Sequence, residues 1–334
     1  MSLPTPPRSV NADPRATTLA YDRALRRDGE VSSEGRDERG FVASADGVEL
    51  FYRSHGRGSP PMVCCNGLGV STFFWHYLVD HFRGRSRVVL WDYPGHGRSQ
   101  LPGDDASLSV ERLARDMWAV SDRLGLENPI LLGHSLGVQV ILEAYRQRPA
   151  EVGGLVPILG TYRRPLDSFY DFRYSRTAFD AAIRLAGSRL GPSLERWLWQ
   201  PLLALPVAWN VAGASNMVNS ARVDRTELRR YLHHLVDIGM PLFFRLARDI
   251  ADHDATAVLP EIDIPTLIVA GEYDTFTPIA ASYHMRDTIV GAELLFLEGA
   301  THAGIVEQPE IIYPRVERWV DENFADPLTP GEEP

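Results

Sequence analysis

The sequence predicts an α/β fold with a mostly parallel central sheet, helices on both of its faces, and an inserted helical cap. Short apolar runs alternate with longer helical patterns over residues 40–159 and again over 258–325. Such alternation is typical of parallel sheets that are covered by helices. Between these ranges, residues 160–257 contain helix-like segments without a convincing strand, which predicts a separate helical layer over the sheet.

Length, composition and charge limit the class of protein. The chain has 334 residues, 44% hydrophobic and 23% charged, which is enough for one large core with an inserted subdomain. The net charge of −10 and the lack of a basic run argue against nucleic-acid binding. No stretch approaches about 18 uninterrupted apolar residues and the N-terminus has no apolar core of a signal peptide, so we expect a cytoplasmic protein without an integral membrane segment. The sequence does not predict the oligomeric state.

The first half of the chain alternates strands and helices after a polar arm. Residues 1–39 mix Pro, Ser, Gly and balanced charge, which predicts a flexible arm with one helical turn near residues 19–27. Two short alternating runs flank Asp46-Gly47, a pair that favours a β-hairpin turn. Apolar runs then predict strands over 61–65, 88–91, 129–132 and 152–159, and helical spacing predicts helices near 73–82, 107–124 and 138–145.

The second half begins with the insert and then returns to the alternation. Within residues 160–257, Gly239-Met240-Pro241 is expected to end one helix and to start the next. Strands over 265–270 and 293–297, a helix from Pro278, a final helix over 310–324 and an acidic tail over 326–334 complete the chain. The insert is apolar and aromatic, with Trp197, Trp199, Leu202, Leu203, Trp209, Met217, Phe243 and Phe244. An insert of this kind would cover the sheet edge where ligands bind and would favour a hydrophobic small molecule.

The segment Gly133-His134-Ser135-Leu136-Gly137 places a serine between two glycines at a predicted strand-to-helix junction, the pattern of a nucleophile elbow. The turn must be so tight that a side chain at either glycine would collide with the neighbouring strand or helix. This geometry would expose Ser135 Oγ and aim the backbone N–H of Leu136, at a helix N-terminus, to where an oxyanion would form. The pattern alone fixes only three positions, so the flanking elements carry the prediction.

A serine nucleophile needs a base, and the base needs a carboxylate that orients it. Asp274 follows the predicted strand over 265–270, and His302 follows the next predicted strand. Both residues should therefore lie at the same sheet edge as Ser135. The order Ser, Asp, His along the chain is the order of an α/β-hydrolase.

From about Phe41 to Phe324 the sequence resembles the α/β-hydrolase fold superfamily, as a serine hydrolase with a helical cap. Four segments carry the resemblance: Asn66 to Gly69, Asp92 to Ser99, Gly133 to Gly137, and Gly271 to Asp274 with Thr301-His302. The resemblance implies a second oxyanion donor, which would be the backbone N–H of Leu68. Many members have His-Gly in that loop, whereas this chain has Asn66-Gly67.

Other histidines and carboxylates of the sequence are less suited to these roles. His134 is expected to pack or hydrogen-bond locally, and Asp92 and His96 belong to a turn that is usually structural in the superfamily. Glu272 lies two positions from Asp274 and is expected to point away. Adjacent His233 and His234 cannot share a metal from one helix face, so no metal site is expected. No cofactor is expected either. Two adjacent cysteines, Cys64 and Cys65, are expected to be small buried residues, because they cannot form a disulfide scaffold or a four-ligand zinc site.

The elbow residue distinguishes reactions within the superfamily. Epoxide hydrolases and haloalkane dehalogenases of this fold use an aspartate there, whereas Ser135 suits acyl chemistry. The sequence thus predicts a carboxylesterase-like hydrolase that cleaves an ester of a hydrophobic small molecule through an acyl-enzyme. Thioester, lactone and C–C bond hydrolysis, acyl transfer to another acceptor, and a slow-turnover receptor on the same fold stay open as alternatives.

Overall fold

The structure, a computed structural model, describes residues 37–103, 106–164, 175–186, 188, 190–199, 218–219 and 221–324. The predicted helical turn near residues 19–27, the acidic tail over 326–334, and four aromatic or apolar residues of the insert lie outside the described residues. Those four residues are Leu202, Leu203, Trp209 and Met217.

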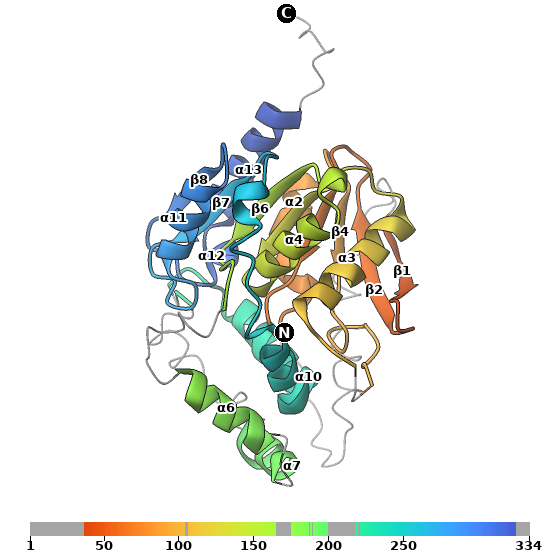
Figure 1. The fold of residues 1–334 in the computed structure, drawn as a ribbon, viewed down its shortest axis with the longest axis vertical. Helices are drawn as coiled ribbons and strands as arrows, with labels where there is room; N and C mark the ends of the chain where they lie inside the picture. The colour runs from red at the N-terminus through yellow and green to blue at the C-terminus, as the bar shows by residue number, and fades with distance from the viewer. Residues whose placement is uncertain are drawn as a thin grey trace, which may run out of the picture. The chain divides into compact units, whose positions relative to one another are not determined.

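An eight-stranded sheet with the order β1-β2-β4-β3-β5-β6-β7-β8 forms the centre of the described chain (Figure 1). Its strands are β1 Glu38–Ala43, β2 Glu49–His55, β3 Met62–Cys65, β4 Val88–Trp91, β5 Ile130–His134, β6 Gly154–Ile158, β7 Leu267–Gly271 and β8 Glu293–Leu297. The pairs from β4 to β8 are parallel, and β1 and β2 join antiparallel at one edge. The prediction of a mostly parallel sheet is therefore confirmed.

The helices and helical turns of the core follow the predicted alternation. They are η1 Thr72–Trp75, α2 His76–Phe82, α3 Val110–Leu124, α4 Leu136–Gln147, η2 Pro149–Glu151, η5 Leu259–Glu261, α11 Ile279–Thr288, α12 Gly304–Glu307 and α13 Pro309–Phe324. Two bounds differ from expectation. Strand β1 begins at Glu38, inside the range predicted as a flexible arm, because Glu38 and Arg39 pair with β2. Helix α3 begins at Val110 rather than near 107, because the Ser109 side chain accepts a hydrogen bond from Arg112 N and caps the helix there.

Helices cover both faces of the sheet. Alternate strand residues enter two separate cores: Val63 and Leu131 pack in the core beneath α3, α4 and α11, whereas Cys64 and Leu132 pack in the core beneath α2 and α13. This alternation is the consequence of side chains pointing to opposite faces of successive strand positions. Both cysteines are fully buried and unbonded to each other, in agreement with the prediction.

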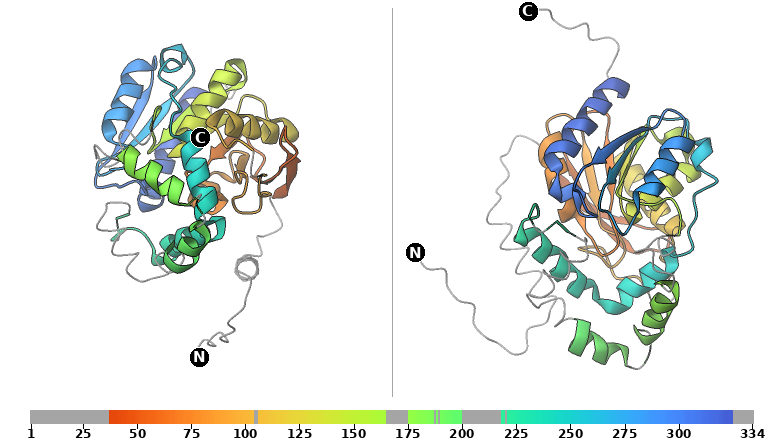
Figure 2. Two further views of the ribbon diagram at one scale, coloured as in Figure 1. Left: turned by 60° about the horizontal axis from the view of Figure 1, so that its bottom comes forward. Right: turned by 90° about the vertical axis from the view of Figure 1, so that its left-hand side faces the viewer.

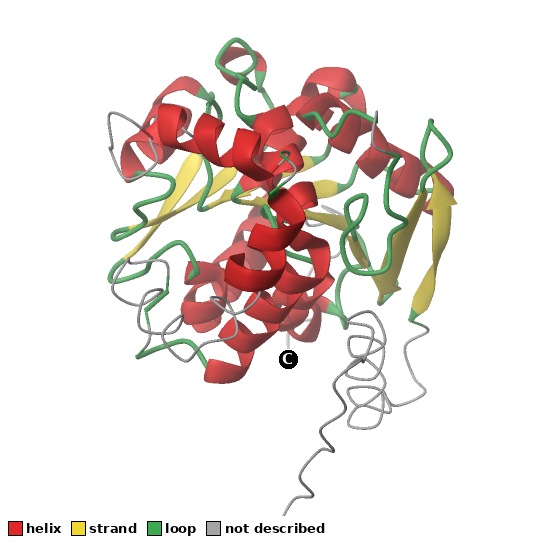
Figure 3. Cartoon of the chain, turned by 90° about the horizontal axis from the view of Figure 1, so that it is seen from below, coloured by secondary structure: helices red, strands yellow, loops and turns green. Residues whose placement is uncertain are grey.

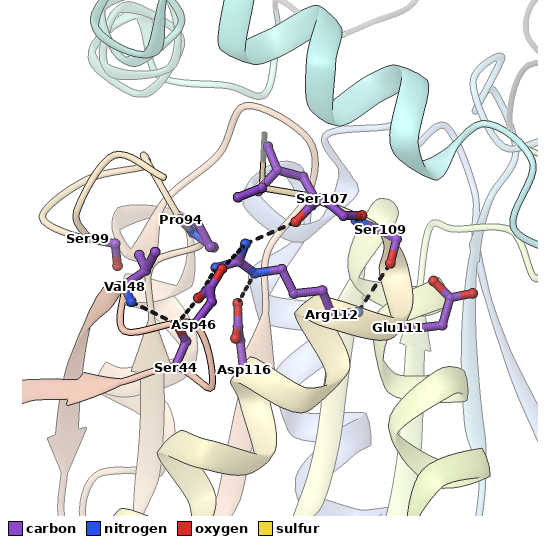
Figure 4. Close-up of polar contacts among 12 residues, drawn as sticks. Ser44, Asp46, Val48, Pro94, Ser99, Ser107, Ser109, Glu111, Arg112 and Asp116 are labelled. Atoms are coloured by element: carbon purple, nitrogen blue, oxygen red, sulfur yellow. Dashed lines mark hydrogen bonds and ion pairs between the residues drawn. The ribbon is translucent and has the colours of Figure 1, made fainter. Parts of the chain in front are cut away.

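A buried arginine ties the β1–β2 hairpin to helix α3 (Figure 4). Arg112 donates from Nη2 to Asp46 Oδ1 at 2.9 Å, from Nη1 to the Ser107 carbonyl at 3.0 Å and from Nε to Asp116 Oδ2 at 3.1 Å. Burial raises the pKa of Asp116 to about 6, although the charge of Arg112 opposes that rise. The hairpin turn at Asp46-Gly47 is thus fixed against the body of the protein.

The insert between β6 and β7 is helical where the structure describes it. It contains α6 Ser175–Ala186, α7 Gly191–Leu194, η4 Glu195–Trp199 and α10 Arg225–Ile250. Helix α10 is broken at Gly239, whose φ of 74° and ψ of 158° are not helical, and Pro241 follows in the next segment. This is the predicted break, since Pro241 lacks the N–H that would continue the ladder. Helices α6, α7 and α10 lie together at one end of the sheet (Figures 2 and 3).

Candidate active site

Ser135 lies in a strained turn between β5 and α4. Its φ of 56° and ψ of −115° are rarely adopted by residues other than glycine. A Cβ atom at Gly133 would lie 2.3 Å from the Gly137 carbonyl oxygen, and one at Gly137 would lie 2.1 Å from the Cys65 carbonyl oxygen. The two glycines are therefore required by close contacts with α4 and β3, as the tight-turn prediction states.

A chain of hydrogen bonds connects Ser135, His302 and Asp274. Ser135 Oγ lies 2.9 Å from His302 Nε2, and His302 Nδ1 lies 3.1 Å and 3.0 Å from the two carboxylate oxygens of Asp274. Because a carboxylate can only accept, Nδ1 carries the proton and Nε2 is free to accept the proton of the serine hydroxyl. The structure thus brings together the three side chains that the sequence placed at separate strand ends.

Asp274 is buried and strongly hydrogen-bonded. Its Oδ2 accepts from Thr277 Oγ1 at 2.6 Å, and its Oδ1 accepts from the backbone N–H groups of Phe276 and Thr277 at 2.9 Å each. Burial by itself would raise the pKa of Asp274, but the charge of His302 and these hydrogen bonds outweigh it and hold the pKa below its usual value. Asp274 is therefore ionised at neutral pH and fixes the orientation of His302.

Two further rings hold the imidazole of His302. Phe276 stacks on it with ring centroids 4.9 Å apart, and the His134 ring lies 5.2 Å away. The sequence reading did not identify Phe276 or Thr277. The spacing Asp274-x-x-Thr277 in a loop could have indicated a side-chain turn, since Asp commonly accepts bonds from the backbone two or three residues on.

The predicted oxyanion donors lie beside the serine. Leu136 is the first residue of α4, and the loop after β3 approaches so closely that a Cβ atom at Gly67 would lie 3.3 Å from Ser135 Cβ. Within the described chain, neither Leu68 N–H nor Leu136 N–H donates a hydrogen bond to another residue. Both N–H groups are therefore without a protein acceptor among the described residues.

Asn66, which stands where many superfamily members have histidine, makes its own set of bonds. It donates from Nδ2 to the Trp91 carbonyl at 2.7 Å, and its Oδ1 and backbone oxygen accept from Trp75 Nε1 at 2.9 Å and from Tyr93 Oη at 2.7 Å. These bonds join the loop after β3 to the loop after β4. Asn66 is thus held at three atoms immediately before Gly67 and Leu68.

Comparison with known proteins decides the family. A family model described as the alpha/beta hydrolase fold matches residues 60–309, which is most of the chain. The chain belongs to the α/β-hydrolase fold family. Among similar hydrolases, the RutD protein of Stutzerimonas stutzeri, which is named for carbamate hydrolysis, is 28% identical over 266 residues, covering 78% of this chain and 92% of that protein.

One further relative in sequence and one solved structure also resemble this chain. The polyketide synthase ThaQ of Burkholderia thailandensis is 29% identical over 320 residues, covering 95% of this α/β-hydrolase but only 14% of that much longer protein. Among solved structures, the esterase EaEST of Exiguobacterium antarcticum has a TM-score of 0.69 at 21% identity, covering 85% of this chain and 100% of that one. The latter likeness supports the α/β-hydrolase fold.

The alternative residues of this α/β-hydrolase have other partners. The sequence predicts that His134 packs or hydrogen-bonds locally, but its Nε2 donates to the carbonyl of the distant His302 at 3.0 Å. Burial lowers the pKa of His134 to about 3. Asp92 accepts from the backbone N–H groups of Thr72 and Arg98, at 3.1 Å each, inside its turn. Glu272 is exposed and accepts from Gly299 N at 2.8 Å. Among the described residues no group of three or more His, Cys, Asp or Glu side chains could hold a metal ion.

Helix α10 packs onto loops that follow the carboxyl ends of the central strands. A Cβ atom at Gly69, after β3, would lie 2.5 Å from Leu235 Cδ2 and 3.3 Å from Phe243 Cε2. A Cβ atom at Gly95, after β4, would lie 2.4 Å from Leu242 Cδ2. The insert therefore places apolar side chains next to the loop after β3 that contains Leu68 and Gly69. None of the helices that the structure describes is long and apolar enough to cross a membrane.

Proposed function

We propose that this protein is a serine hydrolase that cleaves a carboxylic ester, or a related acyl bond, of a hydrophobic small molecule through an acyl-enzyme. The observation that carries the proposal is the continuous hydrogen-bond chain from Ser135 Oγ through His302 to the buried carboxylate of Asp274. A hydroxyl, an imidazole and a carboxylate in this order activate a nucleophile for attack on a carbonyl carbon.

The reaction follows from the positions of these groups. Ser135 Oγ attacks the carbonyl carbon while His302 Nε2 takes its proton, and the negative charge on the carbonyl oxygen is stabilised by the N–H groups of Leu68 and Leu136. His302 then protonates the leaving alcohol, which departs as the acyl-enzyme forms. Water attacks the acyl-enzyme with His302 again as base, and collapse of the second intermediate releases the acid and regenerates Ser135.

Residues 160–257 act in this proposal as a cap on a core of residues 40–159 and 258–325. Support comes from α10, whose Leu235 and Phe243 meet the oxyanion loop at Gly69. Apolar side chains at that place favour an apolar acyl or alcohol group.

A carbamate is a second candidate substrate, because the RutD relative that matches most of the chain is named for carbamate hydrolysis. Carbamates, thioesters and lactones share the electrophilic carbonyl carbon and would use the same residues. A panel of esters, thioesters, lactones and carbamates of varied chain length separates these possibilities. Adding alcohols or amines as acceptors tests acyl transfer, and a burst without steady turnover would indicate a receptor-like protein.

Labelling by a fluorophosphonate tests the proposal itself. The wild-type protein should be labelled once, at Ser135, and Ser135→Ala should fold normally and lose turnover by on the order of 10⁴-fold or more. Labelling at another residue, or turnover that survives Ser135→Ala, would contradict the serine mechanism.

A further inference from the structure

Two buried imidazoles meet where α10 packs onto the loop after β4. His96 belongs to that loop and is fully buried, and His234 belongs to α10 and is 8% exposed. Their ring centroids lie 5.7 Å apart, with an angle of 50° between the ring planes. Tyr93 flanks His96 at 6.0 Å, and Phe73 flanks His234 at 5.9 Å.

Each imidazole has one buried nitrogen without a hydrogen-bond partner. His96 Nδ1 lies 3.1 Å from the Pro94 carbonyl oxygen, so Nδ1 carries the proton and Nε2 presents a lone pair. Nε2 of His96 and Nε2 of His234 are both buried and have no hydrogen-bond partner among the described residues. Leaving such groups unpaired costs about 1–3 kcal/mol each, so buried polar atoms normally have a partner.

Both imidazoles are neutral at neutral pH. Burial lowers the pKa of His96 to about 4, although its hydrogen bond to Pro94 opposes this shift. Burial, with a smaller contribution from His96, lowers the pKa of His234 to about 3. The neutral pair offers a hydrogen-bond acceptor at His96 Nε2 and, in one tautomer of His234, a donor at His234 Nε2.

The pair adjoins the proposed reaction centre. Leu235, the residue after His234, reaches 2.5 Å from the position of a Cβ atom on Gly69, which directly follows Leu68. On its other side, His234 contacts Phe73, whose neighbour Phe74 contacts His134 with ring centroids 5.1 Å apart. The two imidazoles therefore lie on elements that pack against the loop containing Leu68 and against His134, the residue before Ser135.

We propose that His96 and His234 form a specificity site for a hydroxyl group of the substrate, with the hydroxyl donating to His96 Nε2 and accepting from His234 Nε2–H. This inference rests on the proposed hydrolase function. A hydroxyl both donates and accepts, so one group satisfies both nitrogens. A carboxylate would face the lone pair of His96. In the tautomer with the proton on His234 Nε2, an ammonium group would leave that N–H without an acceptor. The substrate class is therefore a hydroxylated ester with an otherwise apolar body.

Matched ester pairs test the proposal in the wild-type protein. The pairs are p-nitrophenyl butanoate with p-nitrophenyl β-hydroxybutanoate, the corresponding octanoates, and ethyl butanoate with the glycol monoester of butanoic acid. Each kcat/KM is divided by the rate of hydroxide-catalysed hydrolysis of the same ester, which removes the electronic effect of the hydroxyl. At least one hydroxylated ester should exceed its partner by about 10-fold or more, because a site built for a hydroxyl disfavours an analogue without it.

Substitutions then assign the preference to the two nitrogens. His96→Asn keeps a side-chain N–H where Nδ1 donates to Pro94 but removes Nε2, and should bring the ratio close to 1. His234→Leu should do the same, whereas His234→Gln retains an amide near the position of Nε2 and should preserve most of the preference. His81→Asn is the matched control and should leave the ratio unchanged, because His81 lies on α2 and pairs with Glu317.

The outcomes are separable. If Ser135 is labelled and esters are turned over but all wild-type ratios are near 1, the hydroxyl site is wrong while the hydrolase proposal stands. The hydroxyl site is also wrong if His96→Asn and His234→Leu lower the melting temperature but keep the wild-type ratio of normalised kcat/KM values. The two imidazoles would then serve packing, with water as the partner of their Nε2 atoms. If Ser135 is not labelled and no ester is cleaved, both proposals fail together.

Discussion

The residue before the candidate nucleophile is bonded to the loop that carries the candidate base: His134 Nε2 donates to the backbone carbonyl of His302 at 3.0 Å. Because Ser135 Oγ also contacts His302 Nε2 at 2.9 Å, consecutive residues of the elbow hold the main chain and the ring of the same histidine. The relative position of elbow and base is therefore fixed at two points.

His134→Phe should slow catalysis without abolishing it. Phenylalanine keeps a ring beside Phe74 and His302 but removes the donor, leaving the His302 carbonyl unpaired. We expect fluorophosphonate labelling of Ser135 and kcat to fall by about 10-fold, equivalent to about 1.4 kcal/mol in the barrier. Labelling at the wild-type rate with a lower melting temperature would show that the bond serves stability alone.

Asp274→Asn should reduce kcat/KM by on the order of 10³–10⁴-fold, because an amide in place of the carboxylate favours the wrong tautomer of His302. His302→Ala should resemble Ser135→Ala. Glu272→Gln is the matched control, since Glu272 lies two residues away on the same turn and instead accepts from Gly299 N. If Glu272→Gln loses most of its kcat/KM while Asp274→Asn stays near wild type, the carboxylate that orients His302 is Glu272 and not Asp274.

Sequence reasoning located the candidate site because its parts are local patterns at strand ends. Ser135 sits in a short elbow pattern, and Asp274 and His302 each follow an apolar strand. Sequence reasoning could not predict contacts between residues that are far apart in the chain. His96 and His234 come from different halves of the chain, and no periodicity encodes their meeting. The support of Asp274 by Phe276 and Thr277 depends on the detailed path of a loop, which composition does not specify.

Glu307 offers a test of another such contact. Its buried carboxylate accepts from Thr301 N at 2.9 Å, from Thr301 Oγ1 at 2.6 Å and from Asn219 N at 2.6 Å. It therefore connects the loop before His302 to the segment that precedes α10. Glu307→Gln should lower the melting temperature and the rate of Ser135 labelling together, the latter by about 10-fold.

Glu310→Gln is the control for Glu307→Gln, because Glu310 is an exposed residue of the following helix α13. Glu310→Gln should change neither the melting temperature nor the rate of Ser135 labelling. If Glu307→Gln lowers only the melting temperature, Glu307 stabilises the loop without positioning His302.

Acid stability should reflect the buried neutral histidines. The folded-state pKa values of His134 and His234 are about 3, below the usual value of 6.5, so between these pH values the unfolded chain binds more protons. Keeping these two histidines neutral costs no folding free energy above about pH 6.5. Below that pH the free energy of unfolding decreases, because the unfolded chain binds protons that the folded protein does not. Near pH 5 each should make the free energy of unfolding change by about 1.4 kcal/mol per pH unit.

Urea unfolding between pH 7 and pH 5 measures this dependence. The measured quantity is the change in the free energy of unfolding per pH unit. His134→Phe and His234→Phe should each reduce it by the amount that corresponds to about one bound proton, whatever their effect on stability at pH 7. An unchanged slope in either variant would mean that the histidine is protonated in the folded protein at pH 5.

Phe243 provides the test of what the insert does to substrate choice. Phe243 lies 3.3 Å from the position of a Cβ atom on Gly69, in the loop after β3 that also contains Leu68. It packs edge-on against Phe244 with ring centroids 5.5 Å apart. Phe243→Ala should therefore open space next to the reacting carbonyl and shift the preferred acyl chain to a longer one, while labelling of Ser135 by a small phosphonate changes less. Phe244→Ala removes the ring that packs on Phe243 and should shift the same preference, because the two rings support each other. Both rings are half-buried, so their removal should cost less than the about 3–5 kcal/mol of a fully buried ring, and melting temperatures are measured for both variants. A large loss of stability with an unchanged chain-length profile in Phe243→Ala would mean that this ring only packs α10 against the body, and its role in the pocket would then be wrong.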